Sequence, residues 1–482
     1  MSVLEGLEPA SVFHFFEEIC NIPHGSGNEK GISDYLKKFA KDRGLFCIQD
    51  EWNNIIIVKE ATFGYRKEEP IILQGHMDMV AVKKQGARID MEKDPLKLIK
   101  EGDYIFAQDT SLGGDDGIAV AYALAILDAK DISHPRLEVI LTVDEEQGLN
   151  GAKKIDLSML QGKRMINLDN EEEGVLLTSC AGGARVKCTI SGVKEKRKGS
   201  VLEIKVSGLK GGHSGTEIHK GGGNAIHILA RVLDAMRQKT SIGLVDIEGG
   251  VADNAIPTSA VAYMWAPESD IGNAIDVIYD VSKEIKEEYQ KQEENLSIVL
   301  SEYTGQSVTC IKQSYMDKIV AFLAAFPNGV QTMSANVEGL VESSLNMGMI
   351  QMEGKEITVT FSIRSSVESA KEAIYRKLNA ICTLAGARIE LSGEYPGWAY
   401  REDSPLRDTM VRVYEEMYGK KPKIQAIHAG LECGLISDKI PGLDCISYGP
   451  DMQDIHSVNE KLCISSVQRV WEYLLEVLKQ RY

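Results

Sequence analysis

The feature that most constrains this chain is a short apolar strand that ends in polar residues. Residues 71–73 (IIL) form an apolar run, which is typical of a strand buried on both faces. Gly75 follows, and then His76 and Asp78, which point to the same side if the extended conformation continues. Asp78 can then hold one imidazole nitrogen while the other binds a metal ion, although a surface ion pair at a solvated strand end explains the same pattern.

Strands and helices alternate through the first part of the chain. The expected elements are helices within residues 5–45 and over 118–128, and strands over 54–58, 70–74, 103–108, 137–143 and 165–168. This alternation predicts an α/β domain, in which helices cover both faces of a mostly parallel sheet. Functional sites of such sheets lie beyond the carboxyl ends of the strands.

The pattern changes near residue 187 to alternating strands with segregated helices, which is typical of an α+β domain. The α/β pattern returns near residue 404 and ends in a helix over 467–480. A chain of 482 residues also exceeds one ordinary core. We therefore predict an α/β domain formed by 1–186 and 391–482, with an inserted domain over 187–390.

Composition and charge narrow the class of protein. The formal net charge of −17 argues against a nucleic-acid-binding surface. We expect no membrane span and no signal peptide, because no stretch has the required apolar length or the charged-then-apolar pattern. The nine cysteines lack any C-x-x-C spacing, which favours reduced thiols in a cytoplasmic protein. The basic run 194–198 (KEKRK), followed by Gly-Ser, predicts a solvated hairpin turn.

Acidic residues follow the expected strands at two further points. The strand over 137–143 is followed by Asp144, Glu145 and Glu146. Since adjacent residues of an extended chain point in opposite directions, one carboxylate can reach a metal while its neighbour faces an attacking water. Asp169 follows the strand over 165–168, within an acidic stretch that a solvated turn also explains.

Two loops complete the candidate set. Asp115 lies in the glycine-rich stretch 111–117 (SLGGDDG), where a helix N-terminus with favourable acidic residues is the alternative. His456 lies in a loop before the last helix, where a hydrogen-bonded loop histidine is the alternative. Together the five segments supply two histidines and three carboxylates without a thiolate. Such a set suits two borderline cations bridged by a shared Asp, with zinc as the first choice and manganese or cobalt as alternatives.

The chain resembles the di-zinc peptidases of the aminoacylase and carnosinase superfamily in six motifs that occur in this order: HMDMV, SLGGDDG, VDEEQGLNGA, NLDNEEE, GGHSG and DIHSVNE. The resemblance spans nearly the whole chain. It implies a zinc-exopeptidase-like catalytic domain that is interrupted by an α+β lid domain. It also implies metal-dependent hydrolysis of dipeptides with a free carboxylate, of the Xaa-His type such as β-alanyl-histidine.

Position by position, the resemblance implies a role for each candidate. His76 and Asp169 would bind one metal, Glu146 and His456 the other, and Asp115 would bridge both. Asp78 would orient His76, and Glu145 would act as general base and acid on a water that bridges the metals. The chain departs from the superfamily after Asp115, where Asp116 and Gly117 stand in place of a frequent Lys or Asn. We expect little consequence from this departure.

The resemblance also implies substrate-binding residues. His213 would stabilise the oxyanion together with a metal, and Asn254 would contact the substrate or the oxyanion. Arg364 would grip the substrate carboxylate, although an exposed strand-end arginine is the alternative. Gly430 would offer backbone contacts near the C-terminal end of the substrate, and Glu432 would lie there or cap a helix.

Two kinds of rival function stay open at this point. A related tripeptidase or N-acyl-amino-acid amidohydrolase would use the same metal set, and a non-catalytic binding protein would keep the same fold. The resemblance also leaves open whether the protein is a homodimer, and whether His213 acts in its own chain or across a dimer interface.

Overall fold

The computed structural model describes residues 3–481, which divide into two compact units. Unit 1 comprises the residues up to Ser179, Tyr400–Ala426 and the residues from Leu431 onward. Unit 2 comprises Cys180–Ala399 and Ile427–Gly430. The second unit is therefore an insertion in the first.

Unit 1 contains an eight-stranded sheet in the order β1-β2-β6-β3-β7-β19-β8-β18. Its strands are β1 (Phe46–Gln49), β2 (Ile55–Lys59), β3 (Ile71–His76), β6 (Leu137–Thr142), β7 (Arg164–Asn167), β8 (Val175–Cys180), β18 (Lys423–Ile427) and β19 (Asp444–Ser447). The four central strands β6, β3, β7 and β19 run parallel, whereas β1 and β2 pair antiparallel. Every residue of β3 and β6 is buried, as the apolar run at 71–73 predicts.

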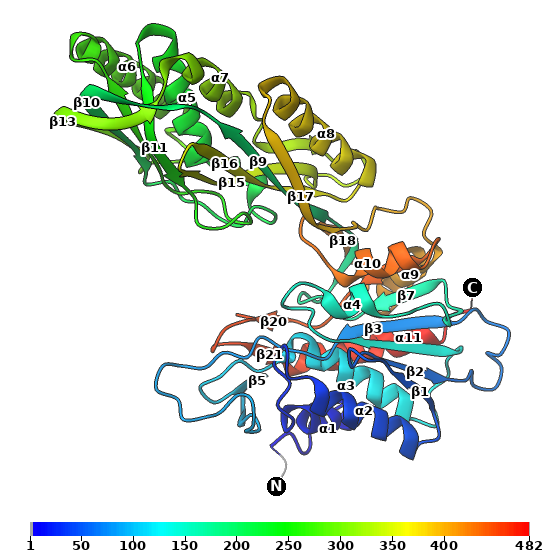
Figure 1. Ribbon diagram of the computed structural model, residues 1–482. Coiled ribbons are helices and arrows are strands. Elements are labelled where there is room, and N and C mark those ends of the chain that lie inside the picture. The colour runs from blue at the N-terminus through cyan, green and yellow to red at the C-terminus, as the bar shows by residue number, and fades with distance from the viewer. Residues whose placement is uncertain (1–2, 482) are drawn as a thin grey trace. The chain divides into compact units, whose positions relative to one another are not determined.

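Helices cover both faces of this sheet. They are α1 (Ala10–Cys20), α2 (Lys30–Asp42), α3 (Gly114–Asp128), α4 (Asn150–Lys154), α9 (Pro405–Tyr418), α10 (Glu432–Lys439) and α11 (Ile464–Leu478). Figure 1 shows α1 and α3 on one face and α4 and α10 on the other. Apart from its terminal Asp128, α3 is buried all round, because its small apolar residues let it pack between β3 and α1. The α/β class predicted from the alternation is confirmed.

A smaller antiparallel sheet of unit 1 joins distant parts of the sequence. Its order is β20-β21-β5-β4, with β4 (Leu98–Glu101), β5 (Tyr104–Ala107), β20 (Met452–Gln453) and β21 (Lys461–Cys463). Because β20 and β21 form a hairpin, residues 454–460 are their connecting loop. This loop carries His456.

Unit 2 is built on an antiparallel nine-stranded sheet in the order β13-β10-β12-β11-β15-β16-β9-β17, with β14 paired to β15. Its strands are β9 (Gly182–Ser191), β10 (Lys194–Ser207), β11 (Gly243–Gly249), β12 (Ala260–Ala266), β13 (Ser297–Ile311), β14 (Gly329–Met333), β15 (Val341–Glu353), β16 (Glu356–Ser365) and β17 (Arg388–Tyr395). Its helices are α5 (Ala225–Lys239), α6 (Ile271–Tyr289), α7 (Gln313–Ala325) and α8 (Glu368–Ala385), and they share one apolar core with the sheet. The inserted α+β architecture is confirmed.

The hairpin turn predicted at the basic run 194–198 is wrong. Residues 194–198 begin the long strand β10, where Lys194 is the partner of Ile311 and Lys198 the partner of Ser307 on β13. The charged side chains are compatible with a strand here because solvent reaches them, with Lys196 to Lys198 exposed. A run of charged residues is therefore as compatible with a solvent-exposed strand as with a turn.

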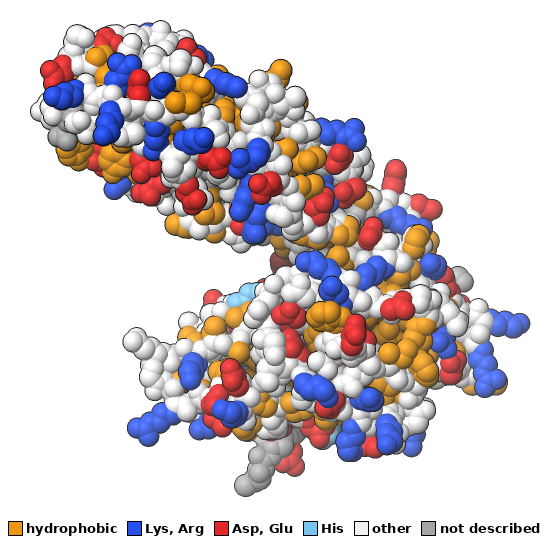
Figure 2. Space-filling view, viewed as in Figure 1, with side chains coloured by type: hydrophobic (Ala, Val, Ile, Leu, Met, Phe, Trp, Pro, Cys, Tyr) orange, Lys and Arg blue, Asp and Glu red, His pale blue; other side chains and the backbone are white. Residues whose placement is uncertain are grey.

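The charged surface and the free cysteines match what the charge and the cysteine spacing of the sequence predict. Side chains of both charges are spread over the visible surfaces, with smaller apolar areas between them (Figure 2). All nine cysteines are free, and eight of them are buried. Within residues 3–481, no helix combines the length and apolar character that a membrane crossing requires.

Candidate metal centre and active site

The candidate residues of unit 1 gather at one edge of its main sheet. Strand β3 lies between β6 and β7, and all three run parallel, so that their carboxyl ends meet. His76 is the last residue of β3, where it pairs with Thr142 at the end of β6. Residues 144–146 and Asp169 follow the ends of β6 and β7, which places their side chains around His76.

Asp115 is presented by a tight loop that precedes the regular part of α3. Gly113 has a φ of 69°, and a Cβ there would come within 2.8 Å of the Met79 sulfur. The buried carboxylate of Glu460 accepts hydrogen bonds from the backbone N–H groups of Leu112 (2.7 Å), Gly113 (3.1 Å) and Gly114 (2.8 Å). This cap fixes the three residues before Asp115.

The five predicted metal ligands lie together. The Asp115 carboxylate faces both histidines, with Oδ1 3.1 Å from His76 Nε2 and Oδ2 3.0 Å from His456 Nε2. Asp169 Oδ1 lies 3.5 Å from the same nitrogen of His76, and Glu146 Oε1 lies 2.8 Å from that of His456. The arrangement therefore has two ends, each with one histidine and one carboxylate, joined by Asp115.

Asp78 lies behind His76 and is completely buried. Its Oδ1 is 3.4 Å from His76 Nδ1, and its backbone carbonyl is 3.0 Å from the same nitrogen. The Asp78 carboxylate also accepts hydrogen bonds from Ser26 Oγ and from the backbone N–H groups of Glu145 and Glu146. One carboxylate thus orients the imidazole and the acidic loop that follows β6.

Asp116 is a residue whose part in the site the sequence did not reveal. It is completely buried beside His76, and its Oδ2 accepts a hydrogen bond from the His76 backbone N–H at 3.1 Å. Ligand atoms of His76, Asp116 and Asp169 lie within 4.8 Å of one another, as do those of Asp115, Glu146 and His456. The glycine before His76 was the available signal, because the bare backbone at Gly75 makes room for this carboxylate.

The electrostatics of the cluster favour bound positive charge. Burial raises the pKa of Asp169 to about 6, with Asp115 and Glu146 adding to the effect and His76 opposing it. The hydrogen bonds that His456 donates to the carboxylates of Asp115 and Glu146 raise its pKa to about 10. Burial opposes a charged His76, but Asp169, Asp115 and Asp78 outweigh it and raise the His76 pKa well above its usual value. These nitrogen and oxygen donors therefore fit two cations, which would relieve the repulsion among the carboxylates.

Glu145 lies at the same edge of the sheet but is not one of the carboxylates paired with His76 or His456. Burial raises the pKa of its carboxyl group well above its usual value, His76 opposes this shift, and Asp169, Glu432 and Glu146 add to it. A carboxylate with a raised pKa is the type that can accept a proton and return it near neutral pH. Asp144 just before it has a φ of 52°, a left-handed backbone at the point where the chain leaves β6.

Glu432 is neither a helix cap nor exposed. It is completely buried in unit 1, where its Oε2 accepts hydrogen bonds from Gln74 Nε2 and Thr142 Oγ1, both at 2.5 Å. Burial raises the pKa of Glu432 to about 8, opposed by His76 and by the hydrogen bond from Thr142. It links Gln74 of β3 to Thr142 of β6 beside the candidate centre.

The predicted substrate-binding residues all belong to unit 2. His213 and Asn254 line one cavity of about 360 Å³ beside the segment 250–259. Arg364, at the end of β16, is buried, and its NH2 group lies 3.4 Å from His213 Nε2. The exposed strand-end arginine considered as the alternative is therefore excluded. Gly430 lies against the ring of Tyr395, where a Cβ would come within 3.0 Å of Cε2.

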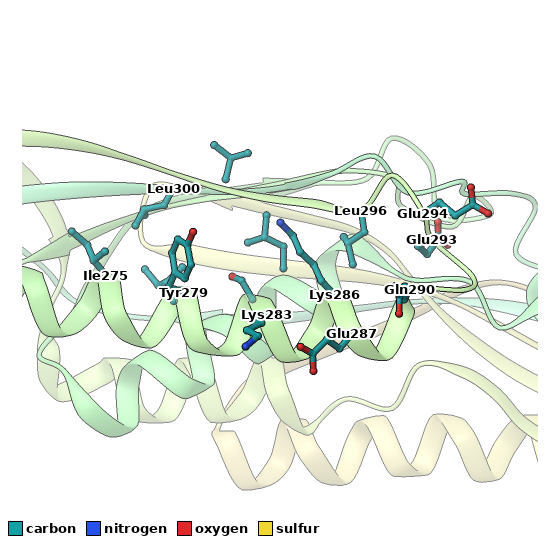
Figure 3. Close-up of a pocket in the computed structure, with 14 residues that line it drawn as sticks. Ile275, Tyr279, Lys283, Lys286, Glu287, Gln290, Glu293, Glu294, Leu296 and Leu300 are labelled. Atoms are coloured by element: carbon teal, nitrogen blue, oxygen red, sulfur yellow. The ribbon is translucent and has the colours of Figure 1, made fainter.

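A larger groove of about 780 Å³ lies elsewhere in unit 2. It runs between α6 and β13, with Tyr279 and Lys286 of the helix directed toward Leu296, just before the strand, and Leu300 within it (Figure 3). None of the groups of potential metal ligands within residues 3–481 includes a residue of this groove. We assign no catalytic role to it.

Comparisons with known proteins agree with this geometry. The cytosol non-specific dipeptidase of Escherichia coli (strain K12) is 36% identical over 482 residues, covering 100% of this chain and 99% of the relative. The crystal structure of an aminoacylhistidine dipeptidase from Vibrio alginolyticus superposes with a TM-score of 0.95 at 36% identity, covering 99% of this chain and 98% of that one. A tripeptidase from Staphylococcus aureus shares the fold alone, with a TM-score of 0.56 at 17% identity and 98% coverage of both chains.

The family comparison covers most of the sequence. The description "Peptidase family M20/M25/M40" matches residues 72–480, a span that begins within β3 and includes every candidate site residue. The predicted kinship with metal-dependent peptidases is confirmed, and the chain belongs to peptidase family M20/M25/M40 as a full-length homologue of a dipeptidase.

Proposed function

We propose that this protein hydrolyses dipeptides with a free carboxylate, and that Xaa-His dipeptides such as β-alanyl-histidine are among its substrates. The observation that carries the proposal is the position of Asp115, whose two oxygens face two histidines that each have a second carboxylate beside them. The full-length similarity to two proteins named as dipeptidases supports the substrate class.

In this proposal His76 and Asp169 would hold one metal, Glu146 and His456 would hold the other, and Asp115 would serve both. Zinc suits the mixed nitrogen and oxygen donors, and manganese or cobalt are the alternatives. Bound metals of this kind polarise a carbonyl group and make water more acidic. Asp116 lies close enough to His76 and Asp169 to serve as a further carboxylate at their end.

Glu145 acts as the general base and then as the general acid. It takes a proton from the attacking water and returns it to the leaving amine of the scissile bond. Its raised pKa supports this role, since a carboxyl group with an ordinary pKa holds a returned proton too weakly. Asp78 supports it indirectly, because the hydrogen bond from the Glu145 backbone fixes the loop that carries the base.

Residues of unit 2 recognise the substrate. Arg364 binds the carboxylate, which a guanidinium can grip through two hydrogen bonds. His213 and Asn254, which share a cavity, stabilise the oxyanion or contact the substrate. Gly430 offers backbone contacts at the C-terminal end of the substrate.

The free and mostly buried thiols support a cytoplasmic location for the protein. A homodimer is part of the proposal, with the monomer as its alternative.

A substrate panel tests the proposal against its rivals. The metal-loaded protein is given matched dipeptides including β-alanyl-histidine, a tripeptide extended from one of them, and an N-acetylated amino acid. We expect the dipeptides to be cleaved with a kcat/KM at least tenfold above the other two classes. Preference for the tripeptide or the N-acyl compound would replace the proposal with one of the related activities, and binding without any cleavage would indicate a non-catalytic protein.

A further inference from the structure

The starting observation is a buried arginine without a carboxylate partner. Arg364 is 8% exposed, and within residues 3–481 its hydrogen bonds go to Tyr395 and to His213, with no carboxylate beside it. A buried, unpaired charge is costly, and chains keep one chiefly where a ligand of opposite charge pairs with it. The guanidinium is therefore prepared for an anion, which under the proposed function is the substrate carboxylate.

Tyr395 reaches this arginine across an intervening strand. In the sheet order β16-β9-β17, Gly183 of β9 is the partner of both Arg364 on β16 and Tyr395 on β17. A Cβ at Gly183 would come within 2.5 Å of the Tyr395 hydroxyl oxygen. The tyrosine ring thus lies over a position that only glycine leaves open, and its hydroxyl accepts a hydrogen bond from Arg364 NH1 at 3.1 Å.

This contact decides which edge of the guanidinium is available. NH1 is engaged by Tyr395, NH2 faces His213 at 3.4 Å, and the buried Nε has no hydrogen-bond partner. The backbone of Gly215 packs closely beside that nitrogen, since a Cβ there would lie 3.2 Å from it and 2.4 Å from the His428 carbonyl oxygen. The edge formed by Nε and NH2 is the one that a carboxylate can bind with two parallel hydrogen bonds.

We propose that Tyr395 is a positioning residue for substrate recognition: its hydroxyl holds the NH1 end of Arg364 so that the Nε–NH2 edge faces the substrate carboxylate. The inference rests on the proposed function and adds a residue to it. Loss of the Tyr395 hydroxyl should therefore weaken binding of the free carboxylate and leave binding of the rest of the dipeptide unchanged.

The experiment compares Tyr395→Phe with the wild type on a dipeptide and on its C-terminal amide, the amide being followed as a competitive inhibitor. Loss of one hydrogen bond is expected to raise the KM of the dipeptide about three- to tenfold, with kcat within about twofold. The inhibition constant of the amide stays unchanged, because the amide offers no carboxylate to the Nε–NH2 edge. Tyr279→Phe, on α6 and 76% exposed, is the matched control and changes neither constant.

Gly183→Ala provides an independent second variant, because its methyl group clashes with the Tyr395 hydroxyl and ring and displaces both from Arg364 while the tyrosine itself is kept. It is expected to raise the KM of the dipeptide in the same selective way, and it carries the test if Tyr395→Phe does not fold. An unchanged KM in both variants, or equal losses for the dipeptide and the amide, would overturn the inference and leave the dipeptidase proposal standing. A wild type that cleaves no dipeptide would overturn both.

Discussion

Gly75 lies directly against the carboxylate of Asp116: a Cβ at Gly75 would come within 2.5 Å of Asp116 Oδ2 and within 2.7 Å of the Ala119 methyl group. This close approach lets a completely buried carboxylate lie beside the last residue of β3. The candidate centre therefore depends on a glycine that is not itself a ligand. The same relationship gives the first prediction.

Gly75→Ala is expected to lower the free energy of unfolding by about 1–3 kcal/mol, because an added methyl group must displace packed atoms. It is also expected to reduce the metal bound per chain, since His76 follows directly. Thermal unfolding and metal analysis measure the two effects. Gly272→Ala on α6 is the control, because a Cβ there meets nothing within 4 Å. Equal stability and metal content in both variants would contradict the packing account.

Glu460→Gln is expected to weaken the loop that presents Asp115. An amide cannot accept with both ends, so at least one of the N–H groups of residues 112–114 loses its partner at a cost of about 1–3 kcal/mol. The variant should melt at a lower temperature and release metal at a lower chelator concentration than the wild type. Glu472→Gln, at an exposed position of α11, should behave like the wild type. A Glu460→Gln variant with unchanged metal retention would show that the cap does not position Asp115.

The buried side chain of His428 is expected to lower the free energy of unfolding in acid. Burial and the positive charge of Arg364 lower its pKa to about 4 in the folded protein, below the ordinary value of 6.5. The unfolded chain therefore binds the proton more readily, so this contribution is fully present above pH 6.5 and is lost as the pH falls toward 4. The loss amounts to about 3 kcal/mol at most.

The matching measurement is the free energy of unfolding between pH 7 and pH 4 for the wild type and His428→Gln. The glutamine amide can keep a hydrogen bond to Ser344, whose hydroxyl lies 2.7 Å from His428 Nε2, but it does not titrate. The variant should show a flatter pH dependence, whereas His14→Gln on the exposed face of α1 should keep the slope of the wild type. Parallel curves for all three proteins would rule out His428 as the source.

Local patterns in the sequence indicate why part of the candidate centre lies at one edge of the sheet. His76, Glu146 and Asp169 each follow an apolar strand, and parallel neighbours bring such ends to one edge of a sheet. Asp115 and His456 are candidates from their own loops, but only the family resemblance pairs them with particular ligands, because no periodicity links a glycine-rich loop to a hairpin loop 341 residues away.

The supporting residues could not be predicted in the same way. Glu460 caps a loop 346 residues earlier in the chain, and Glu432 supports a strand 358 residues away. Tyr395 meets Arg364 only because a glycine of the strand between them carries no side chain. The turn predicted at 194–198 is wrong because these residues pair with β13, a strand far along the chain. Each of these cases is decided by a long-range contact that no local pattern contains.

The central claim is that Glu145 transfers the proton while His76, Asp115, Glu146, Asp169 and His456 hold two metals. The most direct test measures metal content and β-alanyl-histidine hydrolysis for the wild type and Glu145→Gln, prepared side by side. We predict two metals per chain in both proteins and a kcat reduced by about 10²–10⁴-fold in the variant, the range typical of a lost general base. A Glu145→Gln variant that keeps its metals and retains the kcat of the wild type would contradict the account.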